Sequence, residues 1–233
     1  MKQYYLGIEF GSTRVKAVLI DGEHRIVKSG DYTWKSSLEN GVWTYHMEDV
    51  QTGLRTAIRN LGELPGAVSA MGISGMMHGY LAFDKDWNVL APFRTWQNTM
   101  TGEAAEQLTA EFGFNIPQRW SIAHLYQAVL NGEAHVKNIA HITTLAGYVH
   151  YLLTGENVLG VGEASGMFPI DSEALDYDAA MLEKFDALIA KYGFAWTARS
   201  VLPKVLTAGQ AAGALTQAGS TFLDGLLSAG IPF

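Results

Sequence analysis

The stretch YYLGIEFGSTRVKAVLID, residues 4–21, contains two runs of apolar and β-branched residues separated by a short polar segment. Residues 4–10 and 15–20 each have the composition of a buried strand. The segment between them carries Gly11, Ser12 and Thr13, residue types that favour a tight turn. We therefore expect two antiparallel strands joined at a tip that presents backbone N–H groups and two hydroxyls.

Further secondary structure is expected after this hairpin. The sequence Asp21-Gly22-Glu23-His24 predicts a turn into a third strand over residues 25–34, which completes an antiparallel meander. We expect a helix next, and we expect Pro65-Gly66 to end it. Its evidence is a set of apolar residues at helical spacing: Val50, Leu54, Ala57, Ile58 and Leu61.

The remaining sequence predicts more helices than strands. Strands are expected over residues 67–74, 80–84, 141–144 and 158–162. Helices are expected over residues 102–112, 121–130, 145–153 and 177–192, the second of them capped by Ser121. Because no repeat or linker interrupts these elements, we expect residues 1–233 to form one domain of the α/β class. Its mixed sheet would begin with the three-strand meander and be covered by helices.

Composition excludes several function classes. The 233 residues are 48% hydrophobic, enough for a substantial core, and 16 basic against 23 acidic residues give a net charge of −7. With no cluster of Lys and Arg, nucleic acid is not expected as a partner. The absence of Cys excludes disulfides and fits a reducing compartment. With neither a signal-peptide pattern nor a run of ~18 apolar residues, we expect a cytoplasmic protein without a membrane partner.

The tip at Gly11, Ser12 and Thr13 is suited to binding a phosphate. Several backbone N–H groups and two hydroxyls at one turn can surround an anion, and Lys16 or Arg14 could add positive charge. Glu9 stands just before the tip, where a carboxylate could hold Mg²⁺ directly or through water. The alternative is an ordinary hairpin with a Gly-Ser turn, because the pattern is short and degenerate.

A second polar segment is suited to binding a polyol. His78 lies in a loop flanked by Gly75 and Gly79, where a ligand can approach the chain closely. The indole of Trp96 and the amides of Gln97 and Asn98 offer a face and hydrogen bonds for reading sugar hydroxyls. The alternatives are that His78 is a turn histidine satisfied by backbone and that Trp96 belongs to the core.

Two further groups of residues carry weaker signals. The segment Glu163-Ala164-Ser165-Gly166 could line the sugar side of a cleft, although a simple turn explains it nearly as well. The other histidines are dispersed without metal-ligand spacing, so no zinc site is expected. They are His124, His135, His141 and His150.

Several motifs resemble those of a known family. The hairpin YLGIEFGSTRVKAVLID resembles the first phosphate-binding hairpin of the actin and hexokinase superfamily, and more narrowly that of the FGGY carbohydrate kinases. GISGMMHGYLAFD, which contains Met77 and His78, resembles the sugar-site segment of xylulokinase-like members. TWQN, LTGE and EASGMFPID resemble further family segments in the same order. Glu9 stands where the family usually has Asp, and Gln97-Asn98 replaces its Asn-Asp.

The resemblance implies the N-terminal, sugar-binding domain of a kinase that phosphorylates a ketose or polyol, most closely a xylulose-like sugar, with ATP and Mg²⁺. Gly11, Ser12, Thr13 and Lys16 would bind the ATP phosphates and Glu9 the metal. The sugar would contact Met77, His78, Trp96, Asn98 and Glu163. No catalytic residue is expected in this chain, because the resemblance places the catalytic Asp beyond Phe233, in sequence leading to a C-terminal nucleotide-binding domain that is absent here. The chain alone is therefore expected to be inactive.

Two other functions remain open at this point. A non-catalytic actin-like scaffold or ligand-binding module would share the fold, but it has no reason to gather His and amide groups around a concave site. An acetate-kinase-like enzyme would need a positively charged pocket, and no Arg is adjacent to the sugar loop in sequence. A homodimer is also left open, because sequence does not fix the oligomeric state.

Overall fold

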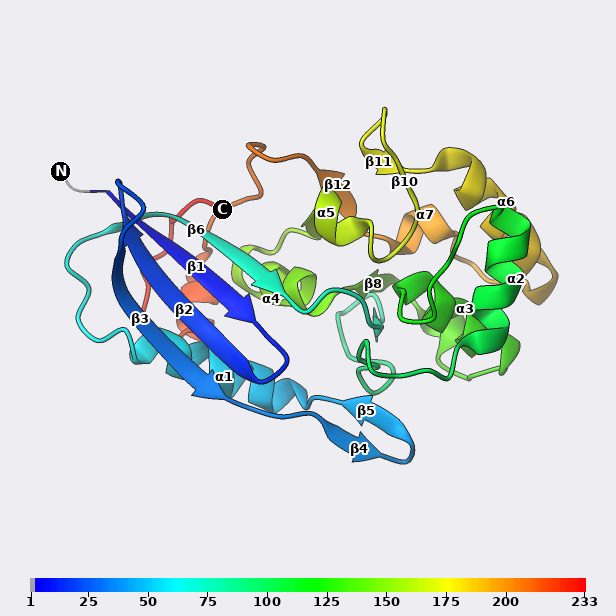
Figure 1. Cartoon of the computed structure of the whole chain (residues 1–233), viewed down its shortest axis with the longest axis horizontal. Coiled ribbons are helices and arrows are strands. Elements are labelled where there is room, and N and C mark those ends of the chain that lie inside the picture. The colour runs from blue at the N-terminus through cyan, green and yellow to red at the C-terminus, as the bar shows by residue number, and fades with distance from the viewer. Residues whose placement is uncertain (1–2) are drawn as a thin grey trace.

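The computed structural model describes residues 3–233 and contains a four-stranded mixed sheet in the order β3-β2-β1-β6. β1 pairs antiparallel with β2 and β2 with β3, whereas β6 lies parallel to β1 (Figure 1). The predicted meander and mixed sheet are both confirmed. The strands are β1 (Tyr4–Phe10), β2 (Arg14–Asp21), β3 (Ile26–Thr33) and β6 (Val68–Gly75).

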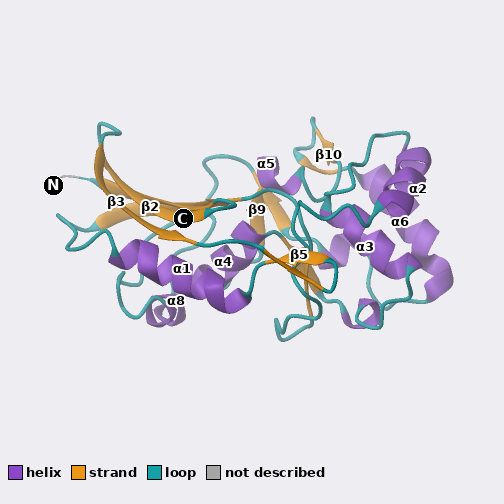
Figure 2. Cartoon of the chain, turned by 60° about the horizontal axis from the view of Figure 1, so that its bottom comes forward, coloured by secondary structure: helices purple, strands orange, loops and turns teal. Residues whose placement is uncertain are grey.

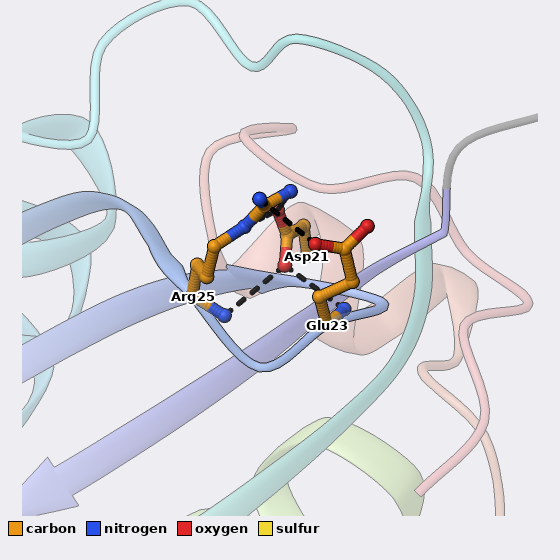
Figure 3. A network of polar contacts seen from close by, with 3 residues as sticks. All are labelled: Asp21, Glu23 and Arg25. Carbon is orange, nitrogen blue, oxygen red and sulfur yellow. Dashed lines mark hydrogen bonds and ion pairs between the residues drawn. The ribbon is translucent and has the colours of Figure 1, made fainter.

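The turn between β2 and β3 is held by the Asp21 carboxylate (Figure 3). Its Oδ1 accepts hydrogen bonds from the backbone N–H groups of Glu23, at 2.9 Å, and Arg25, at 3.0 Å. Its Oδ2 accepts from Nη2 of Arg25 at 2.8 Å, and the Arg25 hydrogen bonds hold the pKa of Asp21 below its usual value. His24 takes a left-handed conformation with φ 60°, as a tight turn requires.

Helices cover one side of the sheet, where α1, α4 and α8 all lie (Figure 2). α1 packs on β3 so closely that a Cβ at Gly30 would lie 2.2 Å from the carbonyl oxygen of Ala57. α4 packs on β6 and α8 on α4. These helices are α1 (Met47–Arg59), α4 (Leu145–Thr154) and α8 (Gln217–Phe222). Together with the sheet they enclose the first of two hydrophobic cores.

The second core lies among helices beyond the sheet. It is built on α2 (Gly102–Phe112), α3 (Ser121–Leu130), α6 (Ala179–Ile189) and α7 (Ala198–Val201). The pair β7 (Leu81–Phe83) and β8 (His141–Thr143) lies between the two cores. Leu81 and Phe83 point into the sheet core and Ala82 into the helical core, as strand alternation dictates. The residues just before β7 therefore lie at the junction of the cores.

Several boundaries differ from the predictions. α1 ends at Arg59, well before Pro65-Gly66. α6 begins at Ala179 because the Asp178 side chain caps it by accepting from the N–H of Met181. The prediction that Ser121 caps α3 is wrong: the N-cap is Trp120, and the Ser121 hydroxyl instead donates to the carbonyl oxygen of Gly79 at 2.6 Å.

Short elements complete the fold. The expected strand over residues 158–162 is β9 (Val158–Gly160) followed directly by α5 (Val161–Ala164). The helix expected over residues 177–192 ends in the short 3-10 helix η2 (Ala190–Tyr192). The other short elements, which the sequence did not reveal, are β4 (Ser37–Glu39), β5 (Val42–Thr44), β10 (Ile170–Asp171), β11 (Asp176–Tyr177), β12 (Lys204–Leu206) and η1 (Val136–Asn138). None of the helices within residues 3–233 has the length and apolar character needed to cross a membrane.

Candidate active site

The tip of the β1–β2 hairpin is fixed from its buried side by three hydrogen bonds to its carbonyl oxygens. The indole Nε1 of Trp34 donates to Gly11 at 2.8 Å, and its backbone N–H donates to Thr13 at 3.1 Å. The hydroxyl of Tyr45 donates to Ser12 at 2.6 Å. Trp34 and Tyr45 are themselves buried and packed on each other, with ring centroids 4.3 Å apart.

This arrangement turns the amide groups of the tip outward. In a trans peptide the N–H points opposite to the preceding C=O, so inward carbonyls at Gly11 and Ser12 give outward N–H groups at Ser12 and Thr13. Within residues 3–233 neither of these N–H groups has a hydrogen-bond acceptor. Two free, adjacent donors with two hydroxyls form a site that fits a phosphate group.

Glu9 and Lys16 lie beside the tip and pair with each other. They face one another across β1 and β2, with Nζ of Lys16 2.8 Å from Oε2 of Glu9, and both side chains are about half exposed. A Cβ at Gly11 would be 3.8 Å from Oε1 of Glu9, which places the carboxylate next to the turn. Within residues 3–233, no group of three or more His, Asp or Glu residues could hold a metal ion. Because its carboxylate lies next to the turn, Glu9 alone could supply one protein ligand to a cation whose other ligands come from phosphate and water.

His78 has a constrained geometry in its loop. Its φ is 71°, which is uncommon for a residue with a side chain, and Nδ1 lies 3.2 Å from the carbonyl oxygen of Gly166. Both Met77 and His78 contact Gly166, because a Cβ there would lie 3.1 Å from Cε of Met77 and 2.7 Å from Nδ1 of His78. The end of the segment of residues 163–166 therefore lies against the loop that carries Met77 and His78.

A second segment runs antiparallel to the sugar loop. Tyr80 and Arg94 form an isolated antiparallel bridge, so His78 and Trp96, each two residues from the bridge, lie on neighbouring segments. Trp96 is 43% exposed, so the alternative that it belongs to the core is wrong. The Oε1 of Gln97, whose amide the sequence analysis named together with that of Asn98, is buried without a partner in the described chain.

Asn98 was expected to contact the sugar, but its side chain is buried and bonded to the protein backbone. It is 3% exposed, its Oδ1 accepts from the N–H of Trp43 at 2.8 Å, and its Nδ2 donates to the carbonyl oxygens of Trp43, at 2.8 Å, and Thr95, at 3.0 Å. The amide is thus engaged by the protein. Trp43 is in β5, two residues before the Tyr45 that holds the hairpin tip, so Asn98 ties the Trp96 segment to the part of the chain that supports this tip.

Arg119 also lies near the sugar loop, which corrects the inference drawn from sequence proximity. The backbone carbonyl of Arg119 accepts a hydrogen bond from the N–H of Gly79 at 3.1 Å. Burial lowers the pKa of His78, and the positive charge of Arg119 lowers it further. The fold thus brings an Arg beside a loop from which it is distant in sequence.

Glu163 faces a separate concavity of about 470 Å³ between β6, α4 and α5. Ser74, His150 and Phe233 also line this cavity, whereas His78 does not. Burial raises the pKa of Glu163 to about 6, against the effect of a hydrogen bond from Thr144. Its Oε1 is buried without a partner in the described chain, so the carboxylate has unused hydrogen-bonding capacity.

The chain resembles several known proteins. The family model described as the FGGY family of carbohydrate kinases, N-terminal domain, matches residues 4–233. A glycerol kinase from Thermococcus gammatolerans is 25% identical over 202 residues, covering 79% of this chain and 41% of the relative. A xylulose kinase from Haemophilus influenzae is 26% identical over 231 residues, covering 91% of this chain and 45% of the relative.

Solved structures agree with the architecture. The structure of a gluconate kinase from Lactobacillus acidophilus matches with a TM-score of 0.83 at 18% identity, covering 100% of this chain and 47% of that one. A xylulose kinase from Rhodospirillum rubrum matches with a TM-score of 0.82 at 20% identity, covering 98% of this chain and 48% of that one. These likenesses confirm the expected α/β fold of the actin-like ATPase type. The chain spans less than half the length of these relatives.

Proposed function

Since the chain belongs to the FGGY family of carbohydrate kinases, we propose that it is the sugar-binding domain of an enzyme that transfers the γ-phosphoryl group of MgATP to a ketose or polyol. A xylulose-like sugar is the preferred substrate. The observation that carries the proposal is the convergence on His78 of segments from both cores, next to a hairpin whose free N–H groups suit phosphate.

In this proposal the hairpin binds the nucleotide phosphates. The outward N–H groups of Ser12 and Thr13 and their hydroxyls contact the phosphate oxygens, while Gly11 allows close approach and Lys16 adds positive charge. Glu9 would hold Mg²⁺, which when bound neutralises phosphate charge. The donors are fixed before ATP arrives, because Trp34 and Tyr45 already orient the tip.

The sugar would lie against His78, with Met77 and Trp96 providing apolar contact and Gln97 a further amide. Asn98 acts from behind the site, by holding the Trp96 segment to β5. Glu163 stays a candidate contact, because it lies only three residues from Gly166, which touches the sugar loop. Charge and hydrogen bonds at this site would position one hydroxyl for transfer.

We assign neither the catalytic base nor the second side of the nucleotide site to these 233 residues. Transfer needs a group that accepts the hydroxyl proton, and relatives are more than twice as long as this chain. The remaining groups would come from the C-terminal nucleotide-binding domain, and the chain alone would be inactive. A cytoplasmic location also remains a prediction.

Titration calorimetry with the chain tests this proposal. A panel of pentuloses, hexuloses and polyols should include at least one ligand that gives saturable heat, and aldoses of the same size serve as controls. A complete lack of binding across the panel would contradict a sugar site and favour the scaffold alternative.

A further inference from the structure

The contact between Gly166 and His78 determines which nitrogen of the imidazole carries hydrogen. Nδ1 lies 3.2 Å from the Gly166 carbonyl oxygen. A carbonyl oxygen only accepts hydrogen bonds, so Nδ1 must be the donor. A neutral imidazole has one N–H, and Nε2 is then left with a free lone pair.

The surroundings of the ring favour this neutral form. Burial lowers the pKa of His78, the hydrogen bond to Gly166 opposes this effect and the charge of Arg119 adds to it, so the net shift favours the neutral ring. Within residues 3–233 no group bonds to Nε2. The side of the ring away from Gly166 therefore offers an acceptor and no donor.

While the His78 ring occupies its observed position, no residue larger than glycine fits at position 166. An added Cβ would lie 2.7 Å from Nδ1 and 3.0 Å from Cε1 of His78. The φ of Gly166 is not left-handed, so the requirement comes from this approach and not from backbone conformation. Gly162, on the same short segment, has nothing within 4 Å of an added Cβ and provides a matched control.

We propose that Gly166 is a positioning residue that sets sugar specificity through His78. It holds the ring in the Nδ1–H tautomer, so Nε2 accepts a hydrogen bond and the substrate must present a donating hydroxyl at that point. A carbonyl, ether or fluorine at the same position cannot donate and is rejected. This inference rests on the proposed function, which supplies the sugar.

The tautomer can be tested without any sugar. Histidine-selective ¹⁵N NMR of the chain gives separate signals for the two ring nitrogens, and His78→Gln identifies those of His78. We expect Nδ1 to show the shift of a protonated nitrogen and Nε2 that of an unprotonated one. Gly166→Ala should abolish this fixed pattern, while Gly162→Ala should keep it. A protonated Nε2 in the unchanged protein would overturn the inference.

Specificity is tested with a ketose that binds and with its monofluorinated analogues, each lacking one donating hydroxyl. One analogue should bind about tenfold more weakly than the parent ketose and leave the Nε2 signal of His78 unmoved. Gly166→Ala should lower the affinity for the parent ketose by a similar factor. Equal affinity for all analogues would overturn the inference while leaving the proposed function intact. If no ketose or polyol binds, the proposed function itself fails, whatever the tautomer.

Discussion

His78 combines backbone strain with a defined hydrogen bond. A non-glycine residue at φ 71° carries a cost of about 1–3 kcal/mol, which persists only where surrounding contacts enforce it. Here two hydrogen bonds fix the neighbouring Gly79: its N–H donates to the carbonyl oxygen of Arg119, and its carbonyl oxygen accepts from the hydroxyl of Ser121. The flanking glycines indicated the loop in sequence, but the contacts with Arg119 and Gly166 could not be predicted, because they are distant along the chain.

Replacing His78 separates a ligand role from a structural one. We expect His78→Ala to abolish ketose binding in calorimetry, since the acceptor nitrogen is lost, and to leave the melting temperature nearly unchanged, because the side chain is only half buried. Retained binding with a large drop in melting temperature would show that His78 is structural.

Glu163 should make stability depend on pH. Its pKa is raised from 4.5 to about 6 in the folded chain, so the folded state binds the proton more tightly than the unfolded state. The resulting stabilisation is present below about pH 4.5 and is lost as the pH rises through about 6, a change of about 2 kcal/mol.

Glu163→Gln should remove this dependence, because the amide is never ionised. Chemical denaturation at pH 4.5 and pH 7.5 should show the variant gaining stability relative to the parent only at the higher pH. Glu183→Gln removes the same charge from an exposed position of α6 and is the control. An equal difference at both pH values would mean that the Glu163 carboxylate is not destabilised by burial.

At the scale of elements, the conformation of the β1–β2 hairpin tip depends on residues outside the hairpin. Tyr45→Phe deletes the hydroxyl that donates to the Ser12 carbonyl, and we expect a loss of about 1–2 kcal/mol in unfolding free energy. Tyr5→Phe is the matched control, because its hydroxyl bonds an exposed Gln3 side chain. Equal stability of both variants in urea denaturation would mean that the tip is not held by Tyr45.

The contact of α1 with β3 at Gly30 leaves no room for a side chain. Gly30→Ala would place a Cβ 2.2 Å from the Ala57 carbonyl oxygen, and backbone cannot yield as a side chain can. We expect a loss of about 2–3 kcal/mol, measured by denaturation. Gly22→Ala, where an added Cβ meets nothing within 4 Å, should change stability little, and a similar loss in both variants would contradict this account.

Elements with strong local patterns were predictable from the sequence. β1 and α2 have the bounds expected, because the residues that form them carry the pattern of a strand and of a helix within the segment itself. The hairpin β4–β5 was not predicted, because its three-residue strands are stabilised by long-range contacts such as Trp43 with Asn98. The same contact explains why Asn98 looked like a sugar ligand: a buried amide and an exposed one are identical in sequence.

At the scale of the whole molecule, the proposed site lies where two hydrophobic cores meet. β7 contributes alternate side chains to each core, so the sugar loop before it is supported from both. The phosphate hairpin belongs to the sheet core, and the backbone N–H of Met76 donates to Phe10 at 2.8 Å, which joins the two parts of the site. Figure 1 shows β1 and β6 side by side, ending toward this junction.

The chain by itself should not transfer phosphate. It carries one phosphate hairpin and, in our proposal, no catalytic base, so MgATP and a binding ketose should yield no sugar-dependent ADP in a coupled assay. A chain that binds ketose but forms no ADP fits the account. Sugar-dependent ADP formation at an ordinary kinase rate would show that the catalytic groups lie within these 233 residues.

A crystal structure of the chain with a bound ketose tests the central claim most directly. We expect a sugar hydroxyl within hydrogen-bond distance of Nε2 of His78, the sugar beside Trp96, and Nδ1 still bonded to the carbonyl oxygen of Gly166. A ketose bound instead in the cavity beside Glu163, with His78 making no contact to it, would contradict the account.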